Sequence, residues 1–251
     1  MYKRQALITG ATSGIGEAIA RILAPDYKLI ICGRRTEKLD MLKQELAHIT
    51  DIQSLIFDVG HNEAVKSSIE NLPEAWTDID ILINNAGNAH GKDPIHSGNV
   101  ADWDAMIDAN LKGLLYVTRA VTPQMVERKS GHIVNIGSIA GKEVYPNGNV
   151  YCATKFGVDA LTQGLRQELN PYEIRVTAIN PGLVETEFSM VRFKGDQSRA
   201  TEVYEGIEAL RASDIAEVVK FTLNRPPHVV LGDITILAKS QANATIINRK
   251  K

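Results

Sequence analysis

The chain of 251 residues has few cysteines, little net charge and no long apolar run. Its two cysteines, Cys32 and Cys152, are too few for a disulfide framework, and no cysteine–histidine pair has the spacing of a zinc site. A formal net charge of −2 excludes a strongly basic protein, so nucleic acid is not expected as a partner. No apolar run approaches the roughly 18–20 residues of a membrane helix, and no signal peptide is expected. We therefore expect a cytoplasmic protein that binds neither a membrane nor a metal.

Two hydrophobic patterns alternate along the chain. Short apolar runs rich in β-branched residues predict buried strands, and the longer segments between them have helical periodicity. This alternation predicts an α/β protein with a doubly wound Rossmann fold, a seven-stranded parallel sheet with helices on both faces. The predicted strands are residues 6–9, 28–32, 52–57, 79–83, 132–136, 174–179 and 228–236. The predicted helices are residues 16–23, 36–48, 62–72, 103–129, 150–170 and 213–223.

No repeat, low-complexity tract or linker divides the chain, so residues 1–251 are expected to form a single domain. The segment 182–212 lacks clear strand character and directly follows a predicted strand. Loops of this length are uncommon in a compact domain and often cover an active site. We expect this segment to be a substrate lid, the alternative being a surface excursion with one short helix at about 200–210.

A glycine-rich turn, Gly10-x-x-x-Gly14-x-Gly16, stands between the first predicted strand and the first predicted helix. Glycines let the backbone turn tightly and approach a pyrophosphate, and the helix start offers free N–H groups and a positive dipole end. This position favours dinucleotide binding over an ordinary glycine-rich turn. The residues expected to bind the nucleotide here are Gly10, Thr12, Ser13, Gly14, Ile15 and Gly16.

The end of the second predicted strand indicates which dinucleotide is bound. NAD enzymes usually place an acid here to accept hydrogen bonds from the ribose, but this chain has Gly33 followed by Arg34 and Arg35. A guanidinium suits a 2′-phosphate, and a positive charge at a helix start opposes the helix dipole, so helix physics does not favour these arginines. The pair therefore predicts NADP(H) as the cofactor, the alternative being a solvated basic pair.

Two further strand ends carry candidate cofactor contacts. Asp58 and Val59 follow the third predicted strand, where Asp58 either accepts a hydrogen bond from the adenine amino group or is a plain turn residue. Asn85, Ala86 and Gly87 follow the fourth, where small residues leave room for a flat cofactor ring. We add these five residues to the predicted nucleotide site.

Ser138 ends the fifth strand region, and Tyr151 and Lys155 stand four residues apart at the start of a long helical pattern. Residues at this spacing share one helix face. A tyrosine hydroxyl has a reference pKa of about 10, too high for proton transfer near neutral pH. A neighbouring ammonium, together with an oxidised nicotinamide ring, would stabilise the phenolate and lower this pKa. The Tyr151–Lys155 pair becomes a more specific sign of a catalytic site because it follows a dinucleotide turn and a serine at a strand end.

These motifs resemble the short-chain dehydrogenase/reductase superfamily over essentially the whole chain. The resemblance implies that Ser138 holds the substrate oxygen and that Tyr151 is the general acid/base. It implies that Lys155 binds the nicotinamide ribose and depresses the Tyr151 pKa, and that Asn110 holds a water linking Lys155 to solvent. It also implies a homo-oligomer, expected to be a tetramer. The residues expected to cap the nicotinamide carboxamide are Pro181, Gly182, Val184 and Thr186.

A narrower resemblance lies in residues 181–196, PGLVETEFSMVRFKGD. This stretch is similar to the NADP-dependent 3-hydroxy acid dehydrogenases, which act on serine, allo-threonine and related short acids, and sulfoacetaldehyde reductases share much of it. Both groups hold a small anion, so Arg192 is the expected clamp for a carboxylate or sulfonate. Tyr145 and Gln241 are further candidates for the substrate pocket. The alternatives are an ion pair of Arg192 with Glu187 or Asp196, a cleft wall at Tyr145 and a terminal cap at Gln241.

Together, these features predict an NADP(H)-dependent oxidoreductase. Hydride would pass between the nicotinamide and a small anionic hydroxy compound or its carbonyl form, while Tyr151 moves the proton. The substrate that we expect first is a 3-hydroxy acid such as serine, allo-threonine or 3-hydroxypropionate. One alternative is a sulfoacetaldehyde reductase that forms isethionate. Another is a non-catalytic NADP-sensing protein, which would not need Ser138, Tyr151 and Lys155 together.

Overall fold

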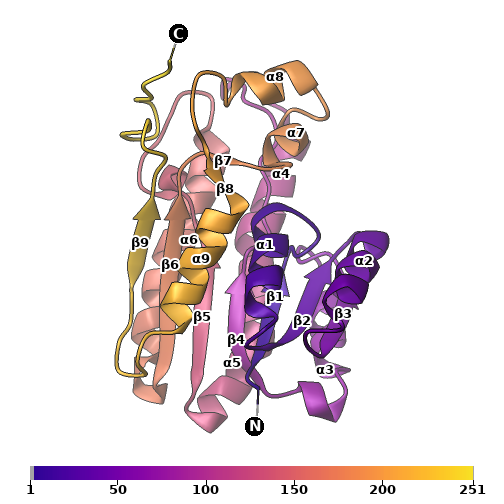
Figure 1. The fold of residues 1–251 in the computed structure, drawn as a ribbon. Coiled ribbons are helices and arrows are strands. Elements are labelled where there is room, and N and C mark those ends of the chain that lie inside the picture. The colour runs from indigo at the N-terminus through magenta and orange to yellow at the C-terminus, as the bar shows by residue number, and fades with distance from the viewer. Residues whose placement is uncertain (1–2, 251) are drawn as a thin grey trace.

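A computed structural model describes residues 3–250 and shows a seven-stranded parallel sheet in the order β3-β2-β1-β4-β5-β6-β9 (Figure 1). Residues 1, 2 and 251 of the expected domain lie outside the described residues. The strand order reverses between β1 and β4, the kind of position where doubly wound sheets bind ligands. The predicted fold class is therefore confirmed. The strands of this sheet are β1 (Gln5–Thr9), β2 (Lys28–Gly33), β3 (Ile52–Ile56), β4 (Ile79–Asn84), β5 (Gly131–Ile136), β6 (Ile174–Pro181) and β9 (Asp233–Ile236).

Helices cover both faces of this sheet, because neighbouring residues of a strand point to opposite faces. Ile31 of β2 packs in the core under one layer of helices, whereas Ile30 packs in the core on the opposite face. The layer nearer the viewer in Figure 1 consists of α1 (Gly14–Leu23), α2 (Thr36–Leu46) and α9 (Ala212–Leu223). The other layer consists of α3 (Asn62–Glu70), α5 (Gly113–Arg128) and α6 (Asn149–Leu169). Each fully buried aliphatic side chain contributes roughly 1.5–3 kcal/mol, so both layers are held mainly by apolar burial.

The predicted helix at 103–129 is interrupted in the structure. It consists of α4 (Val100–Ile107), a π-helical turn η2 (Asp108–Lys112) and α5. A π turn carries an extra residue without breaking the helical path, so periodicity alone does not reveal it. Three 3₁₀ turns connect other elements: η1 (Glu74–Trp76), η3 (Ile139–Gly141) and η4 (Asn170–Tyr172).

Two sequence predictions near the C-terminal end are wrong in detail. The last strand begins at Asp233 rather than at residue 228, because the chain turns where the Val229 N–H donates to the Pro226 carbonyl at 2.9 Å. The short helix that the surface-excursion alternative placed at about 200–210 is α8 (Gln197–Glu202), which begins earlier because the Asp196 side chain caps it. The segment 182–212 also contains α7 (Phe188–Arg192) and two short paired strands, β7 (Val184–Glu185) and β8 (Leu210–Arg211).

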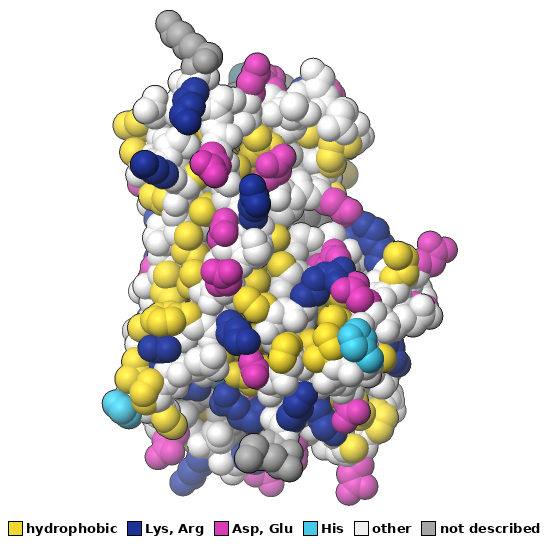
Figure 2. All heavy atoms as spheres, in the orientation of Figure 1, with side chains coloured by type: hydrophobic (Ala, Val, Ile, Leu, Met, Phe, Trp, Pro, Cys, Tyr) yellow, Lys and Arg dark blue, Asp and Glu magenta, His cyan; other side chains and the backbone are white. Residues whose placement is uncertain are grey.

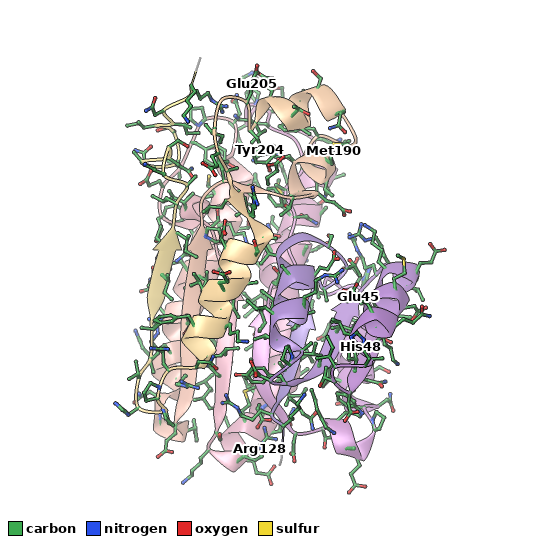
Figure 3. All side chains as sticks on the ribbon, in the orientation of Figure 1. Glu45, His48, Arg128, Met190, Tyr204 and Glu205 are labelled. Carbon is green, nitrogen blue, oxygen red and sulfur yellow. The ribbon has the colours of Figure 1, made fainter. Side chains whose placement is uncertain are left out.

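The segment between β6 and α9 lies at one end of the molecule, together with the C-terminal residues. Figure 1 shows α7, α8 and the last described residues at the end toward which the strands point. Met190 and Tyr204 lie at this end, whereas Arg128 lies at the opposite one (Figure 3). Acidic and basic side chains are interspersed over the face seen in Figure 2. Within residues 3–250, no helix has the length and apolar character needed to cross a membrane.

Candidate active site

A cavity of about 870 Å³ opens at the carboxyl ends of the strands. Its walls come from the glycine-rich turn, the ends of β2 to β6, the start of α6, the segment 182–212 and the C-terminal residues. All of the predicted site residues line it except Gly16 and Asn110, which stand just behind the lining. The fold therefore brings the separate sequence motifs into one cavity.

The ends of β1 and β4 are tied together at the floor of this cavity. The Thr9 hydroxyl accepts hydrogen bonds from the backbone N–H groups of Asn85 at 3.0 Å and Ala86 at 2.9 Å. The Asn85 amide in turn donates to the Thr9 carbonyl at 2.9 Å. These reciprocal bonds satisfy polar backbone at the point where the strand order reverses, and they hold the cofactor candidates Asn85 and Ala86 in place.

The glycine-rich turn has no room for side chains at its critical points. A Cβ on Gly16 would lie 2.3 Å from the Gly10 carbonyl oxygen, and Gly10 itself has φ +67°. Among the described residues, the Ser13 side chain makes no hydrogen bond that caps α1. The first N–H groups of this ten-residue helix thus remain available to an anion. The turn fits the pyrophosphate of a dinucleotide.

The two arginines after β2 have different surroundings. Arg35 donates from Nε and Nη2 to the Thr12 hydroxyl at 3.2 and 3.0 Å, and from Nη1 to Glu187 at 2.9 Å. Arg34 forms an ion pair with Asp58 at 3.1 Å, and its side chain is 68% exposed. Arg35 therefore braces the turn against the segment 182–212, whereas Arg34 is the more accessible cation for a 2′-phosphate.

The carboxylate of Asp58 has two protein partners. It accepts hydrogen bonds from the Gly60 N–H at 2.9 Å and from Arg34 at 3.1 Å. Glu187 also has two cationic partners, and hydrogen bonds from Lys38 and Arg35 lower the pKa of its carboxyl to about 2. Both acids on the cavity wall are thus neutralised by neighbouring cations.

Ser138, Tyr151 and Lys155 come together at the centre of the cavity. One face of α6 carries Tyr151 and Lys155, both buried, and the Tyr151 hydroxyl lies near enough to Ser138 for the serine hydroxyl to lower its pKa. The Ser138 hydroxyl also accepts from the Ala140 N–H at 3.1 Å, which fixes its rotamer. Lys155 Nζ donates to the Ile136 carbonyl at 3.0 Å and lies 6.0 Å from the centre of the Tyr151 ring. The structure therefore assembles the three residues that the sequence placed in one catalytic group.

Burial dominates the electrostatics of this group. It raises the pKa of the Tyr151 phenol, against smaller lowering effects of the Ser138 hydrogen bond and the Arg192 charge. It lowers the pKa of Lys155 to about 8. The lowering of the Tyr151 pKa that we predicted from Lys155 is not produced by the protein groups alone, because removing both side chains from water favours their neutral forms.

Asn110 lies in the π-helical turn behind Lys155. Its side chain donates to the Asn88 carbonyl at 2.9 Å and to the Thr154 hydroxyl at 3.0 Å, and it accepts from the Asn88 N–H at 2.8 Å. A Cβ on Gly87 would meet both the Asn110 Oδ1 and the Lys155 Nζ, at 2.9 and 3.8 Å. The Asn110 amide thus holds the loop after β4 beside Lys155, and its role with a water remains a prediction.

Arg192 projects over the rings of the two tyrosines. Its guanidinium carbon lies 5.6 Å from the centre of the Tyr145 ring and 5.7 Å from that of Tyr151. The ion pairs that we considered as alternatives are not formed among the described residues, since Glu187 pairs with Arg35 and Lys38 while Asp196 caps α8. Arg192 and Tyr145 therefore border the same part of the cavity as Tyr151.

Gln241 has a backbone partner rather than a free side chain. It is buried, and its Oε1 accepts from the Leu183 N–H at 2.9 Å. This geometry favours the structural alternative, in which the C-terminal residues hold the start of the segment 182–212.

Phe188 was not among our candidates, but the centre of its ring lies 5.8 Å from that of the Tyr151 ring, with an angle of 60° between the two ring planes. A lone phenylalanine in an irregular segment carries no sequence signal for such a contact.

No cluster of three histidine, cysteine or acidic side chains among residues 3–250 is arranged to hold a metal ion.

Lys92 and Arg249 also line the cavity, and the sequence analysis missed both because isolated basic residues in loops are usually solvated. The lining is thus rich in cations that the motifs did not reveal.

Comparison with known proteins places this chain in a family. Residues 4–197 match the model of the short chain dehydrogenase family. The NADP-dependent 3-hydroxy acid dehydrogenase YdfG of Salmonella typhi is 47% identical over 240 residues, covering 95% of this chain and 96% of the relative. Sulfoacetaldehyde reductase 2 of Chromohalobacter salexigens is 42% identical over 238 residues and 94% of each chain. The chain belongs to the short-chain dehydrogenase family.

Solved structures agree with this assignment. The closed form of a serine dehydrogenase complexed with NADP+ superimposes with a TM-score of 0.92 at 45% identity, covering 98% of this chain and 100% of that chain. An alcohol dehydrogenase from Thermococcus sibiricus, complexed with 5-hydroxy-NADP, gives a TM-score of 0.84 at 26% identity over the whole of both chains. The family resemblance stated from the motifs is therefore confirmed.

Proposed function

We propose that this protein is an NADP(H)-dependent oxidoreductase that interconverts the hydroxyl and carbonyl forms of a small anionic 3-hydroxy acid. Its family membership supports the chemistry, and the printed activities of its relatives support the substrate class. The observation that carries the substrate class is the position of Arg192. Its guanidinium lies 5.7 Å from the Tyr151 ring, and the described residues give it no carboxylate partner.

The cavity residues fit a nicotinamide dinucleotide phosphate. The glycine-rich turn and the start of α1 would hold the pyrophosphate, and Arg34 would bind the 2′-phosphate. Lys155 would hold the nicotinamide ribose, and residues 181–186 would border the nicotinamide. When bound, the cofactor supplies or accepts the hydride.

Tyr151 would transfer the proton between the substrate oxygen and the protein. Ser138 and Tyr151 line the same cavity as neighbours, so one substrate oxygen placed between their hydroxyl groups would contact both. Burial keeps Tyr151 in its neutral form, which can donate a proton when a carbonyl is reduced. For oxidation, the phenolate must be stabilised by the positive charges of Lys155 and the bound cofactor.

Arg192 would fix the other end of the substrate. A guanidinium binds a carboxylate or a sulfonate through two parallel hydrogen bonds, and a short acid has little apolar surface with which to bind otherwise. The segment 182–212, which carries Arg192, would act as a lid whose closure brings this cation to the substrate.

We also propose that residues 1–251 form one domain and that the protein works as a homo-oligomer, with a tetramer as the first expectation.

The test compares matched charged and neutral substrates. NADP+ reduction is measured with 3-hydroxypropionate, with isethionate and with neutral 1-propanol, and the reverse reaction is measured with sulfoacetaldehyde. Arg192→Ala should raise the KM for the anions about tenfold to a hundredfold, since a charge-assisted hydrogen bond is worth roughly 1.5–3 kcal/mol. Arg192→Lys should restore binding only in part, because an ammonium lacks the planar fork.

The exposed Arg119 on α5 provides a matched control, and Arg119→Ala should behave like the wild-type protein. Equal losses on charged and neutral substrates would contradict the role of Arg192 as an anion clamp. A protein that binds NADP(H) but turns over none of these substrates would favour the sensor alternative.

A further inference from the structure

The charged side chains that line the cavity are unevenly distributed. At the nucleotide end, Arg34 pairs with Asp58 at 3.1 Å and Arg35 pairs with Glu187 at 2.9 Å. Asp58 and Glu187 are the acidic residues of the described lining. Beyond these two pairs, the charged lining residues are Lys92, Lys155, Arg192 and Arg249. The rest of the lining, to which Tyr151 belongs, therefore carries cations without a lining carboxylate.

Most of these cations are occupied by backbone carbonyls. Lys155 donates to the Ile136 carbonyl, and Arg192 donates from Nε to the Gly91 carbonyl at 3.1 Å. Arg249 donates to the carbonyl oxygens that follow α8, including that of Val203 at 3.1 Å. Lys92 differs, because its ammonium has no hydrogen bond or ion pair with any described residue. All three of its N–H donors are thus available to a ligand.

A pair of hydrogen bonds places Lys92 beside Arg192. The Gly91 N–H donates to the Arg192 carbonyl at 2.9 Å, and Arg192 Nε returns a bond to the Gly91 carbonyl at 3.1 Å. Gly91 has φ +65°, a conformation that favours glycine. These bonds join the loop after β4 to the end of α7, so Lys92, the next residue in the chain, lines the cavity near Arg192.

The two cations also influence each other. Burial lowers the pKa of Lys92, and the charge of Arg192 lowers it further. Arg199 and Arg249 act in the same direction, while the carboxylate of Glu202 opposes them. The repulsion between these two like charges costs free energy, and a bound anion with two negative charges would remove that cost more fully than an anion with one.

We propose that Lys92 and Arg192 form a site for two negative charges, so that the preferred substrate is a 3-hydroxy acid with a second anionic group. This inference rests on the proposed function for the reacting hydroxyl, and it narrows the substrate class. Arg192 takes one carboxylate beside Tyr151, and Lys92 takes the second anionic group nearer the mouth. A carboxylate, a sulfonate or a phosphate would each satisfy the Lys92 ammonium, which acts as a point charge.

Binding of unreactive anions tests this inference without turnover. Malonate and propionate have the same number of carbon atoms and differ mainly by one negative charge near neutral pH. Dissociation constants are measured by calorimetry for the protein with NADP+ bound. We expect malonate to bind about tenfold more tightly than propionate, as for one additional charge-assisted hydrogen bond. This preference should weaken as the ionic strength rises, because the mouth of the cavity is open to solvent.

Lys92→Gln should remove the preference for malonate while leaving propionate binding unchanged. Lys66→Gln, at an exposed position on α3, should retain it. Equal malonate preference in the wild-type protein and in Lys92→Gln would overturn the inference. So would a wild-type protein that binds the two anions equally.

Kinetics separates this inference from the proposed function. Malate and 3-hydroxybutyrate each have four carbons and a hydroxyl two carbons from a carboxyl carbon, and malate carries the additional carboxylate. The ratio of kcat/KM for malate over 3-hydroxybutyrate should fall about tenfold in Lys92→Gln and stay unchanged in Lys66→Gln. An unchanged ratio in Lys92→Gln would contradict the role of Lys92. If 3-hydroxypropionate, 3-hydroxybutyrate and malate are all left unoxidised but the malonate preference still depends on Lys92, the proposed function fails and the two-charge site stands.

Discussion

Lys155 makes the stability of this protein depend on pH in an unusual direction. Its side chain is 8% exposed, and burial lowers its pKa from 10.5 to about 8. Between these two values the folded protein holds a neutral amine, whereas the unfolded chain still carries an ammonium. The unfolded state then binds more protons, so the free energy of unfolding rises as the pH rises from about 8 toward 10.5.

The substitution Lys155→Met removes this titration and keeps a side chain of similar length. For a pKa that falls from 10.5 to about 8, proton linkage adds about 2–3 kcal/mol to the free energy of unfolding between pH 7 and pH 10. The variant also loses the hydrogen bond from Lys155 Nζ to the Ile136 carbonyl at 3.0 Å. That loss lowers the stability of the variant, and the change of the Lys155 donor from ammonium to amine is already contained in its lowered pKa.

The assay is urea unfolding of both proteins at pH 7 and pH 10, at one fixed protein concentration. The wild-type protein should gain about 2–3 kcal/mol relative to Lys155→Met over this interval. Lys66→Met, at an exposed position, controls for the loss of a lysine as such. A difference between wild type and Lys155→Met that is the same at both pH values would refute the argument from burial.

Three further substitutions test the proton transfer and the nucleotide site. Tyr151→Phe should keep the fold and cofactor binding but lower kcat about 10²–10⁴-fold in steady-state assays, and near wild-type turnover would remove Tyr151 from the mechanism. Arg34→Ala should weaken NADP(H) binding about tenfold to a hundredfold in fluorescence titrations and change NAD(H) binding little, whereas equal losses would indicate a structural role. Gly16→Ala would place a Cβ 2.3 Å from the Gly10 carbonyl oxygen, so it should weaken binding of both dinucleotides, and unchanged titrations would show that the turn can adjust.

Most of the fold could be predicted because its elements are encoded locally. Six of the seven predicted strands lie within one or two residues of their observed bounds, since buried strands read as short continuous apolar runs. The errors fall where a local signal is weak or was not used. The π turn at Asp108–Lys112 continues the helical path without a break in the sequence pattern, and α8 begins where the side chain of Asp196 caps it.

The candidate site could be predicted to the extent that its residues sit in motifs of fixed spacing. The glycine-rich turn and the Tyr151–Lys155 pair are short-range patterns, and each needs only its own strand or helix to take shape. The pKa of Tyr151 could not be predicted in this way. Its direction depends on how much of the side chain is removed from water, and residues from several elements determine that burial.

The amino-acid sequence by itself determined the parallel α/β fold, the dinucleotide turn and the catalytic motif, because each depends on residues within one element or its immediate flanks. Only the tertiary structure decided the partners of the charged side chains. Arg35 donates a hydrogen bond to Glu187, which lies 152 positions away in the sequence, and Arg192 donates one to the Gly91 carbonyl, 101 positions away. No local periodicity encodes such contacts, since they form only when the sheet brings its strand ends to one edge. The position of the Lys92 ammonium near Arg192, with no partner among residues 3–250, is a consequence of that packing.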